Sequence, residues 1–271
     1  MPAITDLWNL LVMQPMLNLL MFLYAFLFNN FVLAIIGLTI VIRLLTFPLT
    51  QKQIRSMKAM QNLQPEIKKL QKKYAKDREK LSAATMDLYK KHGVNPMMGC
   101  LPMLVQMPMW IGLYQSIYQA LGSTPEQFIG LSQRLYHSIP FMYDIATRSI
   151  PLNSQFLWLH LGRPDPFFVL PVLVVAVFWV QQKLTAQPAV DPSQAQMNQT
   201  MQYMMPIMFG FITLQVSSGL AVYWVASGVL QIVQTGFTTG WGDIRRVLPT
   251  GIPGLPKREE TKKDARRKKK R

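Results

Sequence analysis

Long stretches without a charged residue constrain the fold of this sequence more than any other feature. Four of them contain no Asp, Glu, Lys or Arg, and they cover residues 7–42, 96–125, 166–182 and 192–242. A surface helix of a soluble protein presents charged or polar side chains in every turn, whereas a membrane-spanning helix needs roughly 20 mostly apolar residues. The sequence therefore predicts an all-α integral membrane protein with several spans.

Residues that usually carry catalysis or bind metal ions are scarce. Cys100 is the only cysteine, and the three histidines stand far apart, in no metal-ligand spacing. The sequence contains no GxSxG motif, no HExxH motif and no glycine-rich phosphate-binding loop. We therefore expect that the protein is not an enzyme and that it holds no metal ion or other cofactor.

The N-terminal residues 1–30 differ from a plain membrane span. The first half of their apolar run contains four residues that suit the bilayer core poorly: Asn9, Gln14, Pro15 and Asn18. This pattern predicts a helix that lies on the outer interface or slants into it, although a sixth span stays open. The first six residues contain no Lys or Arg, so we expect no cleavable signal peptide of ordinary form.

The rest of the chain divides at changes in charge and hydropathy. We expect five spans, at residues 31–50, 96–121, 166–183, 202–218 and 219–238, with a cytoplasmic helical hairpin at 51–95, an extracytoplasmic loop at 122–165, a cytoplasmic loop at 184–201 and a basic tail at 239–271.

The hairpin segment is basic and has helical periodicity. Residues 51–93 carry twelve Lys or Arg against four acidic residues. Apolar side chains recur at steps of three or four, as on one face of a helix: Ile54, Met57, Met60, Leu63, Ile67, Leu70 and Tyr74, then Leu81, Thr85 and Leu88. The polar turn AKDRE separates these two runs, which predicts two antiparallel arms. Pro65 should kink or restart the first arm.

Basic residues indicate the orientation in the membrane. The tail carries twelve Lys or Arg, and it is separated from the basic hairpin by four predicted spans. Only Arg134, Arg148 and Arg163 fall on the opposite side. Because Lys and Arg collect in cytoplasmic loops, we expect the hairpin and the tail in the cytoplasm and the N-terminus outside.

Arg43 is the one charged residue deep inside a predicted span, because Lys183 stands at the very end of its own. A charge near the centre of the bilayer costs about 2.5–3.5 kcal/mol on insertion scales, and none of the predicted spans contains Asp or Glu. An anchor that snorkels to the cytoplasmic interface is one interpretation. Otherwise the partner of Arg43 must be water, dipoles, or a group that is not part of this chain.

Other polar residues also recur inside the spans. Trp224, Ser227, Gln231 and Gln234 are spaced by 3, 4 and 3, which places them on one stripe of a helix. Interhelical hydrogen bonds are the ordinary explanation for such residues. Several polar stripes together with Arg43 favour a wet cavity that opens to the cytoplasm.

Three segments of the chain are distinctive: IVIRLLTFPLTQKQIRSMKAMQNLQPEIKKLQKKY, LYKKHGVNPMMGCLPMLVQMPMW and SSGLAVYWVASGVLQIVQ. They resemble the YidC/Oxa/Alb family of membrane protein insertases, in the bacterial YidC form without a large periplasmic domain. The resemblance runs from about residue 7 to residue 237. It implies five spans around a hydrophilic groove, an interfacial helix before them and a cytoplasmic hairpin.

The resemblance also implies particular groove residues and partners. The arginine and threonine of the family groove correspond to Arg43 and Thr39, and its glutamine and aromatic residue correspond to Gln181 and Trp224, beside Tyr223. With Ser227 and Gln231 of the polar stripe, these residues form the expected substrate groove.

The expected partners of the groove are nascent membrane proteins and the lipid bilayer of the bacterial plasma (inner) membrane. The hairpin would meet substrates or targeting machinery, the Sec translocon and the signal recognition particle among them, through Lys68, Lys69, Lys72 and Lys73. The tail would contact ribosomal RNA or anionic lipid through Arg266, Arg267, Lys268, Lys269, Lys270 and Arg271. A channel or a secondary transporter with an anion site at Arg43 is the alternative, although transporters commonly show internal repeats and we find none in this sequence.

Overall fold

The computed structural model describes residues 2–75, 77–95, 101–121, 125–136, 152–185, 189 and 192–240, and these ranges are almost entirely helical. The elements are α1 (Pro2–Trp8), the π-helix η1 (Asn9–Met13), α2 (Gln14–Phe26), α3 (Phe31–Asn62), α4 (Gln64–Lys73), α5 (Arg78–Lys91), α6 (Leu101–Ala120), α7 (Pro125–Arg134), β1 (Gln155–Phe156), β2 (Leu159–His160), α9 (Val169–Thr185), α10 (Pro192–Thr213) and α11 (Ser218–Thr239). The all-α membrane fold expected from the sequence is confirmed.

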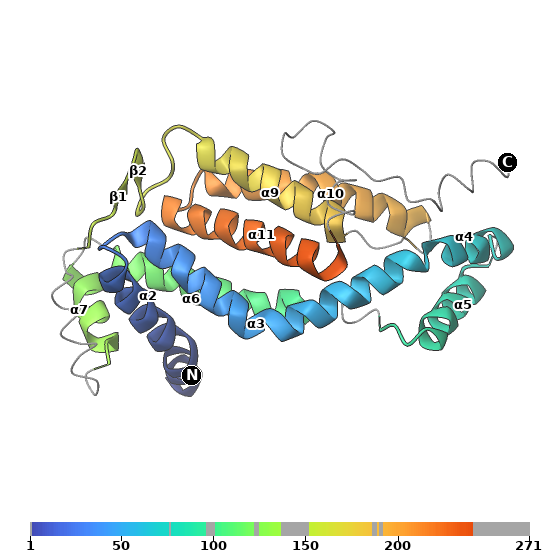
Figure 1. The fold of residues 1–271 in the computed structure, drawn as a ribbon, viewed down its shortest axis with the longest axis horizontal. Helices are drawn as coiled ribbons and strands as arrows, with labels where there is room; N and C mark the ends of the chain where they lie inside the picture. The colour runs from blue at the N-terminus through green and yellow to red at the C-terminus, as the bar shows by residue number, and fades with distance from the viewer. Residues whose placement is uncertain are drawn as a thin grey trace.

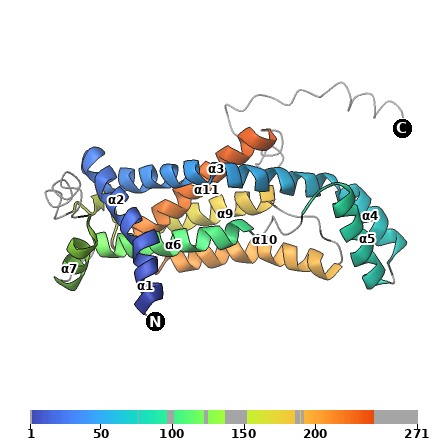
Figure 2. The same cartoon turned by 90° about the horizontal axis from the view of Figure 1, so that it is seen from below.

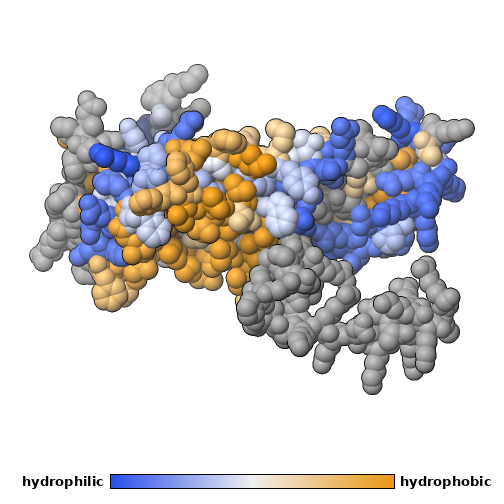
Figure 3. Space-filling model, turned by 90° about the horizontal axis from the view of Figure 1, so that it is seen from above, coloured by the Kyte–Doolittle hydropathy of each residue, from blue (hydrophilic) through white to orange (hydrophobic). Residues whose placement is uncertain are grey.

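The helices form an elongated bundle, and its two ends are built from different elements. The helices α3, α6, α9, α10 and α11 run along the long axis, whereas α1 and α2 cross it (Figures 1 and 2). The α4–α5 hairpin lies at one end, and α7 and the β1–β2 hairpin lie at the other. Figure 3 shows apolar residues gathered over the middle of the bundle and hydrophilic residues over the hairpin end. This distribution is that of a membrane protein.

Length and apolar composition mark some of these helices as candidate spans. Within the described ranges, Thr5–Phe26, Phe31–Asn62 and Ser218–Thr239 are long and apolar enough to cross a membrane, and Val169–Thr185 is a shorter apolar helix. Glutamines and prolines lower the hydropathy of α6 and α10. The number of five spans therefore stays a prediction, as does the interfacial position of residues 1–30, because Thr5–Phe26 also has the length of a span.

Two helices are longer than the spans predicted within them. The helix α3 continues without a break from the predicted span at 31–50 to Asn62, and α10 starts at Pro192, before the span predicted from residue 202. The physical reason is that Lys, Arg and Gln favour helices about as well as Leu does. A rise in polarity thus marks where a helix leaves the apolar layer, and it does not mark where the helix ends. The span boundaries themselves stay predictions.

The hairpin formed by α4 and α5 has a small apolar core, which it shares with the end of α3. Ile54, Met57 and Met60 of α3 pack with Leu63, Ile67 of α4 and Tyr89 of α5. The restart at Pro65 is confirmed, because α4 begins at Gln64 with this proline in its first turn. Asp77 caps α5 by accepting a hydrogen bond from the Lys80 backbone N–H, which holds the pKa of Asp77 below its ordinary value.

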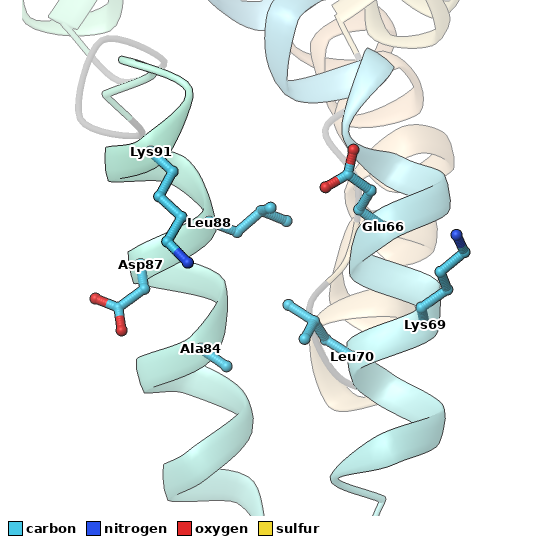
Figure 4. Close-up of a pocket in the computed structure, with 7 residues that line it drawn as sticks. All are labelled: Glu66, Lys69, Leu70, Ala84, Asp87, Leu88 and Lys91. Atoms are coloured by element: carbon cyan, nitrogen blue, oxygen red, sulfur yellow. The ribbon is translucent and has the colours of Figure 1, made fainter.

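A cavity of about 440 Å³ lies between the two arms of the hairpin. Leu70 and Leu88 point toward each other across it (Figure 4). The rest of its wall comes from charged residues and one alanine: Glu66, Lys69, Ala84, Asp87 and Lys91. The arms are therefore in loose contact away from their shared core.

The opposite end of the bundle is closed by short connections. The α11 N-terminus donates two backbone hydrogen bonds to the loop after β2, from Ser218 N to Arg163 O (2.7 Å) and from Gly219 N to Leu161 O (3.0 Å). A Cβ on Gly219 would stand 3.2 Å from Ile117 and from the Leu161 carbonyl oxygen, so a larger residue would have to push the loop away by a few tenths of an ångström. These bonds satisfy N–H groups that a helix start otherwise leaves free.

Two glutamine side chains tie the hairpin end to the connection between α9 and α10. Gln61 of α3 donates to the carbonyl of Leu184 (3.1 Å), and Gln71 of α4 donates to the carbonyl of Ala189 (2.8 Å). The hairpin is thus attached to the bundle at its base and also along the first arm.

We expect that Gln61→Ala combined with Gln71→Ala loosens the hairpin. Two hydrogen bonds are worth about 1–3 kcal/mol together, so the amides of α4 and α5 should exchange roughly tenfold faster with deuterium in nanodiscs. Alanine favours the helix itself, so the effect would come from the lost bonds. The control is Gln64→Ala, an exposed glutamine of α4. Unchanged exchange in the double variant would contradict the role of these two bonds.

Candidate functional site

The candidate site lies where Arg43 of α3 meets α11. The Arg43 Nη1 atom donates to Gln231 Oε1 (2.6 Å), and its Nη2 atom donates to the backbone carbonyl (2.8 Å) and the side-chain Oγ (2.7 Å) of Ser227. Ser227 and Gln231 are one turn apart, so both reach the same guanidinium. Of the partners that the sequence left open, dipoles of this chain are the ones in contact.

Hydrogen bonds to α11 leave part of the Arg43 guanidinium unused. Arginine has five N–H donors, and three of them are directed to α11. Within the described ranges, no carboxylate pairs with Arg43, and its Nε–H and one Nη1–H have no acceptor. The side chain is half-buried. Among the described residues, Arg43 therefore keeps a positive charge and two N–H donors without an acceptor on a half-buried side chain.

Tyr223 connects this arrangement to α6. It is 3% exposed, and its hydroxyl accepts a hydrogen bond from Gln106 Nε2 (2.6 Å). Ser227, which accepts from Arg43, lies one turn further along α11. Polar groups of α6, α11 and α3 thus lie close together as one set.

Trp224 and Gln181 lie beside this set and not in direct contact with the guanidinium. Trp224 packs in an aromatic cluster, with ring centroids 5.5 Å from Trp110 and 5.3 Å from Phe209. Gln181 of α9 donates to the carbonyl of Gly228 (3.3 Å), next to Ser227. A Cβ on Gly228 would overlap Val177, so glycine allows α9 and α11 to pack closely.

Thr39, an expected groove residue, and Gln234, a member of the α11 stripe, make hydrogen bonds away from Arg43. Thr39 is 1% exposed, and its hydroxyl donates to the Ile35 carbonyl in its own helix (2.6 Å). Gln234 is buried and donates to the Phe47 carbonyl (3.5 Å). The four residues lie along one stripe of α11, but they contact different partners. Trp224 contacts aromatic rings, Ser227 and Gln231 contact Arg43, and Gln234 contacts the α3 backbone.

Gln106 is a member of the site that the sequence did not assign to it. In the sequence it stands alone in its span, with no polar neighbour at helical spacing. Its partner Tyr223 is 117 residues away, so no local pattern could have joined them.

Of the two groups of basic residues that were expected to contact partners, the structure describes the lysines of α4 only. Lys68, Lys69, Lys72 and Lys73 are exposed on α4, on the side away from its buried Ile67. The six basic residues at 266–271 lie outside the described residues.

Comparison with known proteins places this architecture in a family. Residues 22–242 match the family described as the 60Kd inner membrane protein. A membrane protein insertase YidC of Nitratidesulfovibrio vulgaris is 40% identical over 228 residues, which are 84% of this chain and 38% of the relative. Another, of Fusobacterium nucleatum, is 39% identical over 232 residues, which are 83% of this chain and 97% of the relative.

A solved structure agrees with these matches. The crystal structure titled "Active YidC insertase crystal structure with the first transmembrane domain resolved" superimposes with a TM-score of 0.52 at 26% sequence identity, over 79% of this chain and 44% of that one. The chain thus spans well under half of some relatives and nearly all of another. Because the match covers most of the sequence and agrees with the fold, this chain belongs to the YidC family of membrane protein insertases.

Proposed function

We propose that this protein inserts nascent membrane proteins into the bacterial plasma membrane through a hydrophilic groove centred on Arg43. The single observation that carries the proposal is the hydrogen bonding of the Arg43 guanidinium. It donates three hydrogen bonds to α11, and within the described ranges it has no carboxylate partner and keeps two N–H donors without an acceptor. Such a group can receive a carboxylate that arrives with a substrate.

The proposed mechanism makes and breaks no covalent bond. A substrate offers a short acidic N-terminal tail from the cytoplasm, and Arg43 attracts it into the groove, so that the tail loses its hydration in steps. The apolar segment that follows then partitions into the bilayer, which the hydrophobic effect favours. The membrane potential assists an acidic tail by about 2.3 kcal/mol per charge per 100 mV.

The two ends of the bundle suit different roles in this mechanism. The β1–β2 loop and the start of α11 are joined by backbone hydrogen bonds, which supports a closed outer end. The hairpin end exposes four lysines of α4, which supports contact with arriving substrates or targeting machinery in the cytoplasm. The N-terminus would then lie outside and the basic tail in the cytoplasm.

Arg43→Ala is the direct test of the groove charge. We expect it to reduce insertion of a single-spanning substrate with an acidic tail about tenfold or more, because a hydrogen bond to a charged group contributes roughly 1.5–3 kcal/mol. Arg43→Lys keeps the charge and should retain much of the insertion. The measurement is protease protection of the substrate tail in proteoliposomes, with acidic and neutral tails compared.

The matched control for this test is Arg163→Ala, which removes an exposed arginine of the outer loop. It should insert both substrates normally. Full insertion of acidic tails by Arg43→Ala would show that the charge is dispensable. Chloride flux through the wild-type protein in the same vesicles, lost in Arg43→Ala, would instead favour a channel.

We further propose that the basic tail binds ribosomes. Deletion of residues 257–271 removes ten of its twelve Lys and Arg residues and should abolish most co-sedimentation with ribosomes. Binding by the intact protein should weaken steeply with salt, because Lys and Arg release counterions from RNA phosphates. Deletion of the uncharged residues 249–256 shortens the tail without loss of charge, and it should bind normally. Equal binding by the protein without residues 257–271 would disprove this role.

A further inference from the structure

We propose that Asn18 and Tyr24 of α2 are positioning residues that hold the outer connections of the bundle closed. Each of the two side chains binds one flank of the loop between α7 and β1, so both flanks are fastened to the same helix. The inference rests on the proposed orientation, in which this end of the bundle faces outward, and it does not depend on the role of Arg43. It also explains the polar Asn18 in the mostly apolar N-terminal run.

The Asn18 side chain holds the chain where it leaves α7. Its Nδ2 atom donates to the backbone carbonyl of Arg134 (2.9 Å) and to the Gln14 carbonyl in its own helix (2.7 Å). Its Oδ1 atom accepts from the backbone N–H of Tyr136 (2.9 Å). Asn18 is only 3% exposed. One shielded amide thus satisfies two backbone groups of the first flank, which an apolar side chain in this position could not do.

Tyr24 holds the second flank of the same loop. Its hydroxyl accepts a hydrogen bond from the backbone N–H of Asn153 (2.8 Å), and its ring packs against Phe31 with centroids 5.9 Å apart. Tyr24 is 2% exposed. Because six residues of an α-helix rise about 9 Å, Asn18 and Tyr24 hold both flanks on one short stretch of α2.

Apolar side chains support the same attachment. Met21 lies between the two polar residues along α2, it packs with Leu135 of the first flank, and Leu152 of the second flank packs against this pair. Leu159 of β2 and Leu161 after it are buried in the core that α2 shares with α3 and α11. Apolar packing is not directional, so the hydrogen bonds from α2 determine where the two flanks lie.

Backbone hydrogen bonds extend the attachment from α2 to α11. Asn153, which donates to Tyr24, is followed by Ser154, and the Ser154 carbonyl accepts from the N–H of Leu161 (2.8 Å). The Leu161 carbonyl in turn accepts from the N–H of Gly219 at the start of α11 (3.0 Å). Loss of the bond at Tyr24 should therefore loosen the contact between the β1–β2 loop and α11 as well.

Hydrogen exchange in nanodiscs tests whether α2 holds the loop. Tyr24→Phe removes one hydroxyl and keeps the ring, so the amides of residues 152–161 should exchange about two- to tenfold faster, the range for the loss of one hydrogen bond. Asn18→Leu keeps the volume of the side chain approximately and removes two bonds to the loop, so the amides of residues 134–136 should exchange about tenfold faster or more. The amides of α4 and α5, at the other end of the bundle, should not change.

The matched control is Gln115→Leu on α6. Gln115 accepts a hydrogen bond from Trp8 Nε1 (2.8 Å), so this variant releases a bond of the same N-terminal segment that does not involve the outer loop. Its loop amides should exchange as in the wild type. Unchanged exchange in both Asn18→Leu and Tyr24→Phe overturns the inference, as does an equal rise in Gln115→Leu. A rise that extends equally to α4 and α5 also overturns it, because that is a loss of overall stability.

A labelling experiment tests whether the attachment closes the outer end. Ala221 of α11 is 1% exposed and lies two residues after Gly219. Ala221→Cys is made together with Cys100→Ser, which removes the only native cysteine, and a membrane-impermeant maleimide is added outside intact cells. Tyr24→Phe or Asn18→Leu should raise the labelling rate about two- to tenfold. An unchanged rate in both variants shows that α2 does not close this end and overturns the inference.

A second cysteine separates this result from the proposed orientation and function. Arg163 is exposed in the loop after β2, so Arg163→Cys in the Cys100→Ser background should be labelled from outside in every variant. If it is not labelled, the proposed orientation is wrong, and the exchange rates alone decide whether α2 holds the loop. If Arg43→Ala inserts acidic tails normally, the proposed function fails, while the exchange and labelling results keep their meaning.

Discussion

The cost of a guanidinium in an apolar bundle is the constraint on which the arrangement of this protein depends. A charged side chain near mid-membrane costs about 2.5–3.5 kcal/mol even by the lowest scales, and exposed Leu44 and Leu45 follow Arg43 directly. Three hydrogen bonds from Ser227 and Gln231 of α11 offset that cost. The pairing of α3 with α11 is thereby fixed in register as well as in orientation.

The same physics explains the glutamines elsewhere in the bundle. Lipid tails are as apolar as leucine, so the hydrophobic effect does not hold helices together inside a membrane, and directional bonds between helices take on that role at about 0.6–2 kcal/mol each. Gln115 joins α6 to α1, Gln106 joins α6 to α11, and Gln181 joins α9 to α11. The ordinary explanation of these residues is therefore correct for each of them. Arg43 differs because two of its N–H groups have no acceptor among the described residues.

Patterns along the sequence predicted the membrane class and the apolar face of the hairpin, because both depend on how apolar residues recur along the chain. They also predicted the restart at Pro65, because proline lacks the backbone N–H that would continue the helix. Two kinds of feature could not be predicted this way. The polar stretches 51–62 of α3 and 192–201 of α10 belong to the same helices as the apolar runs beside them, and a change in polarity does not show this, since Lys, Arg and Gln continue a helix about as well as leucine does. Side-chain partners depend on how helices pack: Thr39 shares a face with Arg43 but bonds to its own helix, and Gln106 finds Tyr223 across the bundle.

The number of bonds that Arg43 makes has a consequence for the proposed mechanism. A resident Asp or Glu would satisfy the guanidinium more completely, but it would also cancel the charge that attracts an acidic tail and would compete with the tail for the same N–H groups. An arginine without any partner would be too costly to keep within the bundle. Neutral dipoles from Ser227 and Gln231 offset the cost without removing the charge. On this argument, replacing Gln231 by Glu would stabilise the position of Arg43 and yet weaken the capture of acidic substrates.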